Sequence, residues 1–198
     1  MRNFNIFKSD FVGVKDNLLT KEECREAIRW TKTHKILQED RQKEQSGYSF
    51  CDLMDRGESI GRCFSPKPLR PIERGLRLLV DSYVEKYPEV QMVESWDIDY
   101  VRFKWWKPGD YYSVWHSEHN INSPLRILSF LIYLSDNDSY TEFSRYEKSE
   151  TKAGSGIMFP AYFTHTHRGS TCKKGLHRYI ASGYFSFINS VGLKLKSI

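Results

Sequence analysis

The sequence has few of the features that mark secreted, membrane-spanning or nucleotide-binding proteins. Its four cysteines form no Cys-x-x-Cys pair and are too few for a disulfide framework in 198 residues, so we expect reduced thiols. Residues Met1–Phe4 do not begin the apolar run of a signal peptide, and no stretch approaches ~18 consecutive apolar residues. A P-loop, a Gly-rich dinucleotide fingerprint and a nucleophile motif are also missing. These absences predict a cytoplasmic protein with no membrane partner.

Strong charge of one sign is missing as well. The formal net charge of +5 comes from 30 Lys and Arg against 25 Asp and Glu, spread along the chain. Such a mild excess permits a basic groove but does not by itself indicate nucleic-acid binding. A length of 198 residues predicts a single domain, 1–198, with a real hydrophobic core. Nothing in the sequence indicates an oligomeric state.

Two amphipathic helices are predicted in the first half of the chain. Thr20 can cap a helix, and Glu23 can reach back to complete a capping box. That helix should end near Lys35. A second helix should have Pro71 in its first turn, carry an apolar stripe on one face, and end at Pro88.

The segment between these helices, residues 38–62, is polar, charged and only weakly periodic. This composition is typical of an exposed surface loop. Because long loops in compact domains often cover a site, the alternative is a mobile lid.

The second half of the chain is predicted to form strands. The segments Ile98–Phe103, Leu128–Leu134 and Tyr179–Phe185 are rich in strand formers and are separated by Gly, Pro, Asn and Asp turn signals. Several such strands favour a two-sheet β-sandwich or jelly roll (double-stranded β-helix). With the N-terminal helices packed on one sheet, the fold class is α+β. We therefore expect a helical support region at 1–95 and a jelly-roll core at 96–190.

The residues that carry chemistry lie in this second half. His116 and Glu118 are two residues apart in an aromatic segment expected to be a strand, so both side chains should point to the same face. His167 would complete a 2-His-1-carboxylate set, which binds Fe(II) and leaves coordination positions open. His165 has the same spacing relation to His167, so spacing alone does not choose between them. We expect His119 and His177 to be loop or surface residues, outside the ligand set.

These residues belong to a larger pattern that resembles the Fe(II)- and 2-oxoglutarate-dependent oxygenases, in particular the prolyl 4-hydroxylase-like branch. The resemblance covers about the C-terminal half of the chain, Trp106–Phe185, and makes the 96–190 jelly roll a catalytic core. Its pieces follow one another in the family's order. They are Trp106-Lys107-Pro108-Gly109, His116-x-Glu118, the apolar strand Arg126–Leu134, Thr141-Glu142-Phe143, Gly156–Pro160, the distal histidine, and Arg178 eleven residues after His167.

The resemblance implies a role for each matching residue. His116, Glu118 and His167 would hold Fe(II), with Glu118 standing where the family more often has Asp. His167 is favoured over His165 because the family has His-x-Gly followed by a basic residue on the next strand. Arg178 and Tyr133 would hold the far carboxylate of 2-oxoglutarate.

Trp106 occupies the position of the family's Tyr beside the cosubstrate and offers only an indole N–H. Oxygen would be the second cosubstrate, and ascorbate could keep the iron reduced. The resemblance to this branch implies a prolyl residue in a peptide or protein as the substrate.

Two other functions stay open at this point. The first is a nucleic-acid demethylase of the same superfamily, which the pI of about 8.9 favours. That branch typically has a basic or amide residue six positions after the cosubstrate arginine, where this chain has Tyr184. The second is a non-enzymatic or cupin-like metal-binding jelly roll, against which the complete ligand set and Arg178 argue.

Overall fold

The computed structural model describes residues 5–6, 11–43, 45–93, 95–145, 148–173 and 175–188. Its helices are α1 (Lys21–His34), α2 (Ile60–Cys63) and α3 (Arg70–Lys86), with 3₁₀ turns η1 (Pro88–Met92) and η2 (Phe163–His165). Its strands are β1 (Asn5–Ile6), β2 (Gly13–Lys15), β3 (Gln38–Gln42), β4 (Ser46–Met54), β5 (Trp96–Trp106), β6 (Tyr111–His116), β7 (Arg126–Tyr133), β8 (Asn137–Phe143), β9 (Ser149–Thr151), β10 (Gly156–Pro160), β11 (His167–Gly169) and β12 (Arg178–Phe187).

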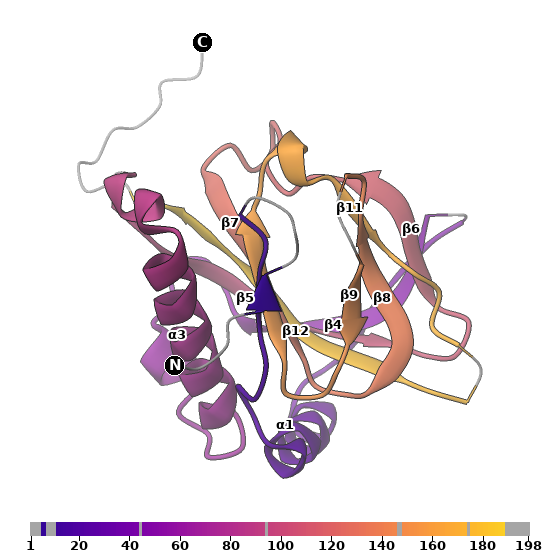
Figure 1. Ribbon diagram of the computed structural model, residues 1–198. Coiled ribbons are helices and arrows are strands. Elements are labelled where there is room, and N and C mark those ends of the chain that lie inside the picture. The colour runs from indigo at the N-terminus through magenta and orange to yellow at the C-terminus, as the bar shows by residue number, and fades with distance from the viewer. Residues whose placement is uncertain are drawn as a thin grey trace.

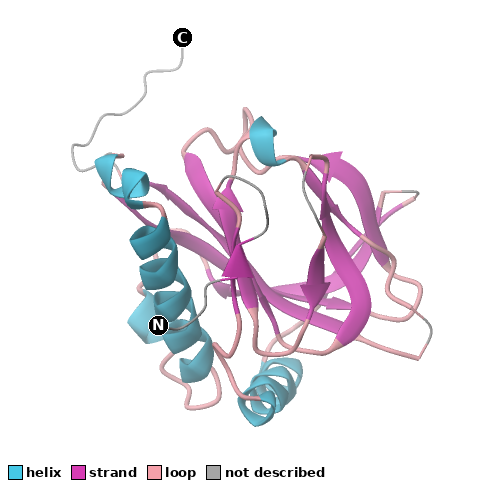
Figure 2. Cartoon of the chain, in the orientation of Figure 1, coloured by secondary structure: helices cyan, strands magenta, loops and turns pink. Residues whose placement is uncertain are grey.

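All the described strands belong to one antiparallel sheet that folds over on itself. The strand order is β1-β2-β10-β7-β12-β5-β4-β6-β11-β8-β9, with β3 paired to β4. Strand β4 pairs with both β5 and β6 and so joins the two halves of the sheet. Figures 1 and 2 show the two halves facing each other across the barrel. This arrangement confirms the predicted jelly roll and the α+β class.

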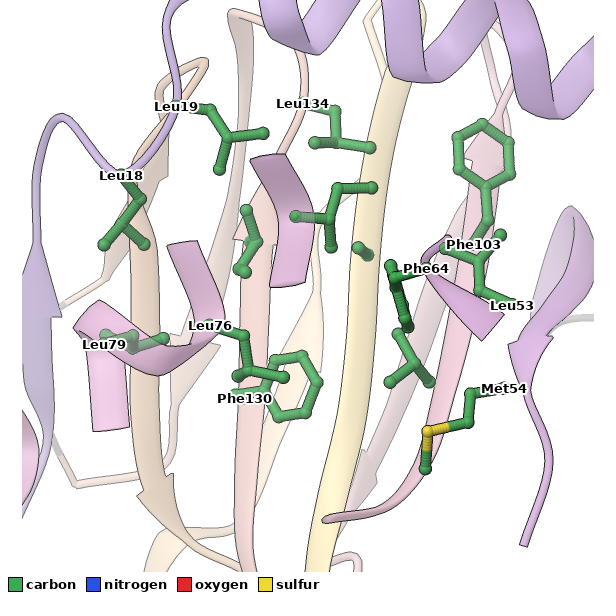
Figure 3. Close-up of a cluster of buried hydrophobic side chains, with 14 of the residues drawn as sticks. Leu18, Leu19, Leu53, Met54, Phe64, Leu76, Leu79, Phe103, Phe130 and Leu134 are labelled. Carbon is green, nitrogen blue, oxygen red and sulfur yellow. The ribbon is translucent and has the colours of Figure 1, made fainter. Parts of the chain in front are cut away.

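The helices α1 and α3 cover the outer face of one half of the sheet (Figure 1). Leu76 and Leu79 of α3, Phe103 of β5 and Phe130 of β7 belong to the same buried cluster, which Figure 3 shows. Each of these side chains is at most 2% exposed. Burying apolar surface of this kind is the main stabilising contribution to the fold.

Local sequence signals define the helix ends as predicted. Thr20 Oγ1 accepts a hydrogen bond from Glu23 N at 3.2 Å, and Thr20 N donates to Glu23 Oε2 at 2.8 Å. This capping box satisfies two backbone N–H donors at the start of α1. Helix α3 has a proline in its first turn, and Pro88 begins η1 directly after it. The three strands predicted in the second half coincide with parts of β5, β7 and β12, except that Leu134 lies one residue beyond the end of β7.

The interpretation of residues 38–62 as a loop was wrong. They form β3, β4 and α2, and β4 lies inside the sheet, so the expected boundary at residue 95 does not separate the jelly roll from a helical region. The physical reason lies in the two faces of β4. Cys51 and Leu53 pack in the apolar core, whereas Tyr48 and Asp52 point to the other, polar side. Polar residues on that face are partly or fully buried, so their polarity did not signal exposure.

Two further features of the fold concern the cysteines and the length of the helices. All four cysteines are free thiols. Among the residues with described positions, no helix is both long enough and apolar enough to cross a membrane.

Candidate metal and cosubstrate site

The three residues predicted as metal ligands meet in one cluster. Each of His116, Glu118 and His167 offers a ligand atom, and these atoms lie within 4.8 Å of one another. Glu118 Oε1 lies 3.4 Å from His116 Nε2 and 3.7 Å from His167 Nε2. Strands β6 and β11 are paired with His116 opposite His167, which brings together residues about fifty positions apart in sequence.

Glu118 reaches the cluster from a loop and not from a strand. Strand β6 ends at His116, so the predicted strand geometry of the His-x-Glu pair is wrong at its second residue. The loop is held instead by Glu118 N, which donates to Ala161 O at 3.0 Å. Arg126 Nη1 lies 3.5 Å from Glu118 Oε2, so the two carboxylate oxygens face different partners.

Backbone carbonyls orient both histidine rings. His116 Nδ1 lies 2.9 Å from Val114 O, and His167 Nδ1 lies 3.0 Å from His165 O. Since a carbonyl can only accept, each Nδ1 is assigned as the N–H donor. The lone pair of each ring is then on Nε2, the atom that faces Glu118. Hydrogen bonding of this kind fixes the tautomer of histidine ligands in metal sites.

The charge states of the cluster also suit a metal. Burial lowers the pKa of His167 to about 4, an effect that His116 reinforces and Glu118 opposes. For Glu118, burial alone would raise the pKa, but the hydrogen bond and charge of His116 and the charge of His167 hold it well below its usual range. A neutral imidazole and an ionised carboxylate are the forms that bind metal ions.

The other histidines lie outside this cluster. His165 is buried in η2, where its Nδ1 lies 2.9 Å from Thr164 Oγ1 and its backbone carbonyl holds the His167 ring. The structure thus brings His167, not His165, to His116 and Glu118. His119 lies in a loop against Tyr162, and His177 is exposed in a loop beside Trp105, as expected.

The cluster opens into a cavity of about 510 Å³ between the two halves of the sheet. Because side chains alternate along a strand, every second residue of β5 and β12 faces this cavity. Those residues are Tyr100, Arg102, Lys104 and Trp106 of β5, with Arg178, Ile180 and Tyr184 of β12. Their neighbours Val101, Phe103 and Ala181 face the apolar core on the other side.

Arg178 is the most unusual charge in the cavity. It is 2% exposed, and its Nη2 donates to Thr141 Oγ1 at 3.1 Å. Its Nε has no hydrogen-bond partner, and no carboxylate among the described residues lies within ion-pair distance of it. Burial lowers the pKa of Arg178 from its ordinary value. A buried guanidinium without a counter-charge is costly, so the site is prepared for an anion.

The other two predicted cosubstrate residues lie near Arg178 but differ in access. Trp106 lines the cavity, stacks on Tyr48 with ring centroids 5.1 Å apart, and lies 5.2 Å from the Arg178 guanidinium carbon. Tyr133 is fully buried and is not part of the cavity wall. Its hydroxyl lies 3.0 Å from Thr141 Oγ1 and donates to Ser149 Oγ at 3.2 Å. Tyr133 therefore lies beside Arg178, with its ring centre 5.8 Å from the guanidinium carbon, and both side chains contact Thr141.

Several cavity residues were not predicted from the sequence. Lys104 is one, and burial lowers its pKa to about 8. Arg102 is another: its Nε donates at 2.7 Å to Asp52, which lies behind the cavity wall and also accepts from the Tyr100 hydroxyl. The alternation Val101-Arg102-Phe103-Lys104 contained the signal, because charged residues that interleave with buried apolar ones in a central strand must face something polar.

The fold is that of solved prolyl hydroxylases and related 2OG-Fe(II) oxygenases. A viral collagen prolyl hydroxylase from Paramecium bursaria Chlorella virus-1, in complex with 2OG (2-oxoglutarate), aligns over 93% of this chain and 100% of its own, at 19% identity and a TM-score of 0.67. A prolyl hydroxylase from Trichoplax adhaerens, in complex with a hypoxia inducible factor peptide fragment, aligns over 90% and 84%, at 12% identity and 0.64. A prolyl-4-hydroxylase from Pseudomonas putida aligns over 89% and 92%, at 16% identity and 0.57.

By sequence, the chain matches no protein-family model and no curated protein. The likeness to these solved structures establishes the fold, and the activity has to be argued from the site.

Proposed function

We propose that this protein is an Fe(II)- and 2-oxoglutarate-dependent dioxygenase that hydroxylates a prolyl residue in a peptide or protein. The observation that carries this proposal is a pairing of two features in one cavity. A 2-His-1-carboxylate cluster lies in the same cavity as Arg178, a buried arginine with no carboxylate partner among the described residues. A bound metal ion alone would explain the 2-His-1-carboxylate cluster but not the buried Arg178.

The cluster suits Fe(II) on its donor chemistry. Two imidazoles and one carboxylate, with the remaining positions open, are the donor set typical of non-haem Fe(II) oxygenases. Both histidines present Nε2 toward Glu118, and Glu118 is ionised. His116, Glu118 and His167 would therefore hold the ion without a change of tautomer. When bound, the iron supplies the reaction with O₂ that oxidises 2-oxoglutarate and hydroxylates the substrate.

The cavity suits a dicarboxylate on charge and size. Its volume of about 510 Å³ lies within the range of small-ligand sites, roughly 300–1,000 Å³. Arg178 can form paired hydrogen bonds with a carboxylate because its Nε is unused and its guanidinium is planar. Thr141 fixes the direction of that guanidinium through Nη2. The keto acid end of 2-oxoglutarate would then face the metal ligands.

The walls of the cavity would orient the reactants and exclude water. Trp106 and Tyr48 stack on each other along one wall, and Ile180 and Leu131 provide apolar surface. Ring contacts also surround His167, which lies 4.8 Å from Phe159 and 5.7 Å from Phe143 between ring centroids. Such packing limits the motion of a ligand residue and keeps side reactions with water low.

The prolyl substrate is the finer part of the proposal. It is supported by the solved neighbours, which are prolyl hydroxylases, one of them in complex with a peptide fragment. Tyr184, six residues after Arg178, lines the cavity where a demethylase of nucleic acids would be expected to have a basic or amide residue. This residue favours a peptide over a nucleobase.

The test begins with metal binding in matched variants. Glu118→Ala should weaken Fe(II) binding more than about 100-fold, since even outer-shell changes cost 10- to 100-fold, whereas Glu118→Asp should retain the ion. His167→Ala should lose the ion and His165→Ala should keep it. The parent protein with Fe(II), ascorbate and 2-oxoglutarate should form succinate, and a screen of proline-containing peptides should show a mass gain of one oxygen. Metal retained in His167→Ala but lost in His165→Ala would overturn the ligand assignment.

A further inference from the structure

The cavity carries more positive charge than metal and cosubstrate require. Five cationic side chains line it, Arg56, Arg102, Lys104, Arg126 and Arg178, against two carboxylates, Asp55 and Glu118. With Fe(II), Glu118, 2-oxoglutarate and Arg178 counted together, the charges sum to zero. Arg102 and Arg56 have carboxylate partners outside the wall, Asp52 and Asp99. Two cations, Lys104 and Arg126, then remain against one carboxylate, Asp55, so the wall keeps an excess of positive charge.

Lys104 is the cation in this group with the least compensation. Among the described residues, no carboxylate lies within ion-pair distance of its Nζ. The nearest aromatic contact of the ammonium is the Tyr48 ring, 5.7 Å from its centroid. Arg126, in contrast, stacks on Tyr184 at 3.6 Å and lies 3.5 Å from Glu118, but its buried Nε has no partner. A cation that lines a cavity without a carboxylate partner is stabilised by an anion that enters from outside.

The register of the sheet separates part of this charge from the cosubstrate end. Lys104 pairs with Ile180 and Arg102 pairs with Ser182, two and four residues along β12 from Arg178. At about 3.3 Å per residue, Arg102 lies on the order of 13 Å along the strand from Arg178. A five-carbon diacid held at Arg178 is too short to reach that far. Arg102 therefore lies beyond the cosubstrate, toward the space that a substrate would fill, and Lys104, about 7 Å along the strand from Arg178, lies between the two.

Arg102 is itself held rigidly for recognition. Asp52 accepts from both Nε and Nη2 of Arg102, at 2.7 and 3.3 Å, and the Tyr100 hydroxyl donates to the same carboxylate. The Arg102 guanidinium also lies 4.0 Å from the centre of the Phe50 ring. Asp52 binds only two of the three guanidinium nitrogens. A fixed arginine beside an uncompensated lysine is an arrangement suited to carboxylate recognition.

Two exposed apolar side chains lie on the segments beside Glu118 and favour a partner larger than a metabolite. Ile121 is 92% exposed and Phe163 is 80% exposed. They lie on two loops joined by the hydrogen bonds of Glu118 N and His119 N to Ala161 O, at 3.0 and 2.9 Å. Exposed apolar side chains around a functional cleft are typical of protein or peptide contacts.

We infer that the substrate is an acidic peptide, whose Asp or Glu side chain beside the target residue binds Lys104 and Arg102. This inference rests on the proposed function and adds the sequence class that the enzyme selects. A nucleic acid would meet the same charge through phosphates, but phosphate recognition needs cations spread along an exposed surface. Here the cations lie inside the cavity, where a single carboxylate can reach them.

Two libraries of fluorescent dodecapeptides with a central proline provide the test, one with Glu and one with Gln at the flanking positions. Binding is measured by anisotropy to the full chain loaded with Zn²⁺ and 2-oxoglutarate, because zinc has no redox chemistry. The Glu library should bind about tenfold tighter or more, and the preference should weaken with salt. Lys104→Gln should remove the preference and Lys104→Arg should restore it. Lys152→Gln, an exposed lysine paired with Asp16, should leave it unchanged.

Three results would overturn the inference. These are equal binding of the two libraries, a preference that survives in Lys104→Gln, and an oligonucleotide that displaces the Glu library better than unlabelled Glu peptides do. Titration of Zn²⁺ and 2-oxoglutarate on the same samples distinguishes failure of the acidic-peptide inference from failure of the proposed function. If both ligands bind and Glu is not preferred, only the acidic-peptide inference falls. If Lys104→Gln loses 2-oxoglutarate affinity with the peptide preference intact, Lys104 belongs to the cosubstrate site and the inference also falls.

Discussion

The two faces of β5 and β12 carry opposite chemistry within a few ångströms of each other. Val101, Phe103 and Ala181 are fully buried against the helices and the other core strands. Arg102 and Arg178 alternate with them and face the cavity. The first face is filled with apolar side chains, as stability requires, whereas the second leaves a space of about 510 Å³. The same strands therefore act as scaffold on one side and as site on the other.

The packed core face of β5 and β12 explains how the site can be polar without weakening the fold. Burying Arg178 costs free energy of folding. The apolar packing on the other face of the sheet offsets this cost, and the guanidinium donates one hydrogen bond to Thr141. Because the core face and the cavity face have separate roles, substitutions on the two faces should change different measured quantities. Changes on the core face should change the free energy of unfolding, and changes on the cavity face should change ligand affinity.

The largest expected effect is on the core face. Phe103→Ala should lower the free energy of unfolding by about 3–5 kcal/mol, because it removes a buried ring and leaves a cavity between β5 and the helices. The affinity of the folded fraction for 2-oxoglutarate should change no more than about twofold, since Phe103 points to the opposite face and pairs with Ala181, roughly 10 Å along β12 from Arg178. Denaturant unfolding and ligand titration measure the two quantities. A large loss of 2-oxoglutarate affinity at an unchanged free energy of unfolding would show that the two faces do not have separate roles.

On the cavity face, Arg178→Ala should give the reverse pattern. Removing the charged partner of a carboxylate costs about 2–5 kcal/mol, so 2-oxoglutarate should bind roughly thirty- to several-thousand-fold more weakly. Stability of the ligand-free protein should hardly fall, because the variant also removes an uncompensated buried charge. Arg178→Lys should recover part of the affinity, and iron binding should be retained.

Arg56→Ala is the matched control for that experiment. Arg56 lines the same cavity but is paired with Asp99 and its side chain is 64% exposed. It should leave 2-oxoglutarate affinity nearly unchanged. If Arg56→Ala and Arg178→Ala weaken binding equally, general cavity charge and not a specific anchor holds the cosubstrate.

The comparison also explains what could be predicted from the sequence. The capping box at Thr20, the apolar stripe of α3 and the strand formers of β7 and β12 are local signals, and they predicted these elements correctly. Strand β4 was missed because Tyr48 faces a polar cavity and Asp52 pairs with Arg102 of its wall, so the pattern of β4 looked like a loop. Spacing could not choose between His165 and His167, because His165 ends a 3₁₀ turn and His167 begins β11, so strand alternation does not relate the two side chains.

The charge of the ligand cluster predicts a dependence of stability on pH. The pKa of His167 is about 4 in the folded chain, against 6.5 for an ordinary histidine. The unfolded state therefore binds the proton first as pH falls, and stability that is complete above pH 6.5 is lost as pH approaches 4. Metal-free protein should lose about 2 kcal/mol of unfolding free energy between pH 7 and pH 4.5 from this residue alone.

Urea unfolding of the metal-free parent and two variants at these pH values measures the effect. His167→Gln should show a shallower dependence than the parent, and His177→Gln, a change in an exposed loop, should follow the parent. Identical slopes for the parent and His167→Gln would mean that other groups account for the acid sensitivity.

The smallest expected effect separates Tyr133 from Arg178. The sequence predicts that the Tyr133 hydroxyl binds the cosubstrate, but in the structure it contacts Thr141 and Ser149 and does not line the cavity. Tyr133→Phe should therefore act indirectly, through the orientation of Thr141 and Arg178, and weaken 2-oxoglutarate binding less than about tenfold. Tyr83→Phe is the matched control, because the Tyr83 hydroxyl is equally buried but donates to Phe11 O at 2.9 Å in the apolar core. Both variants should lose about 1 kcal/mol of unfolding free energy, and only Tyr133→Phe should change affinity. A loss in Tyr133→Phe as large as that in Arg178→Ala would mean that the hydroxyl holds the carboxylate directly.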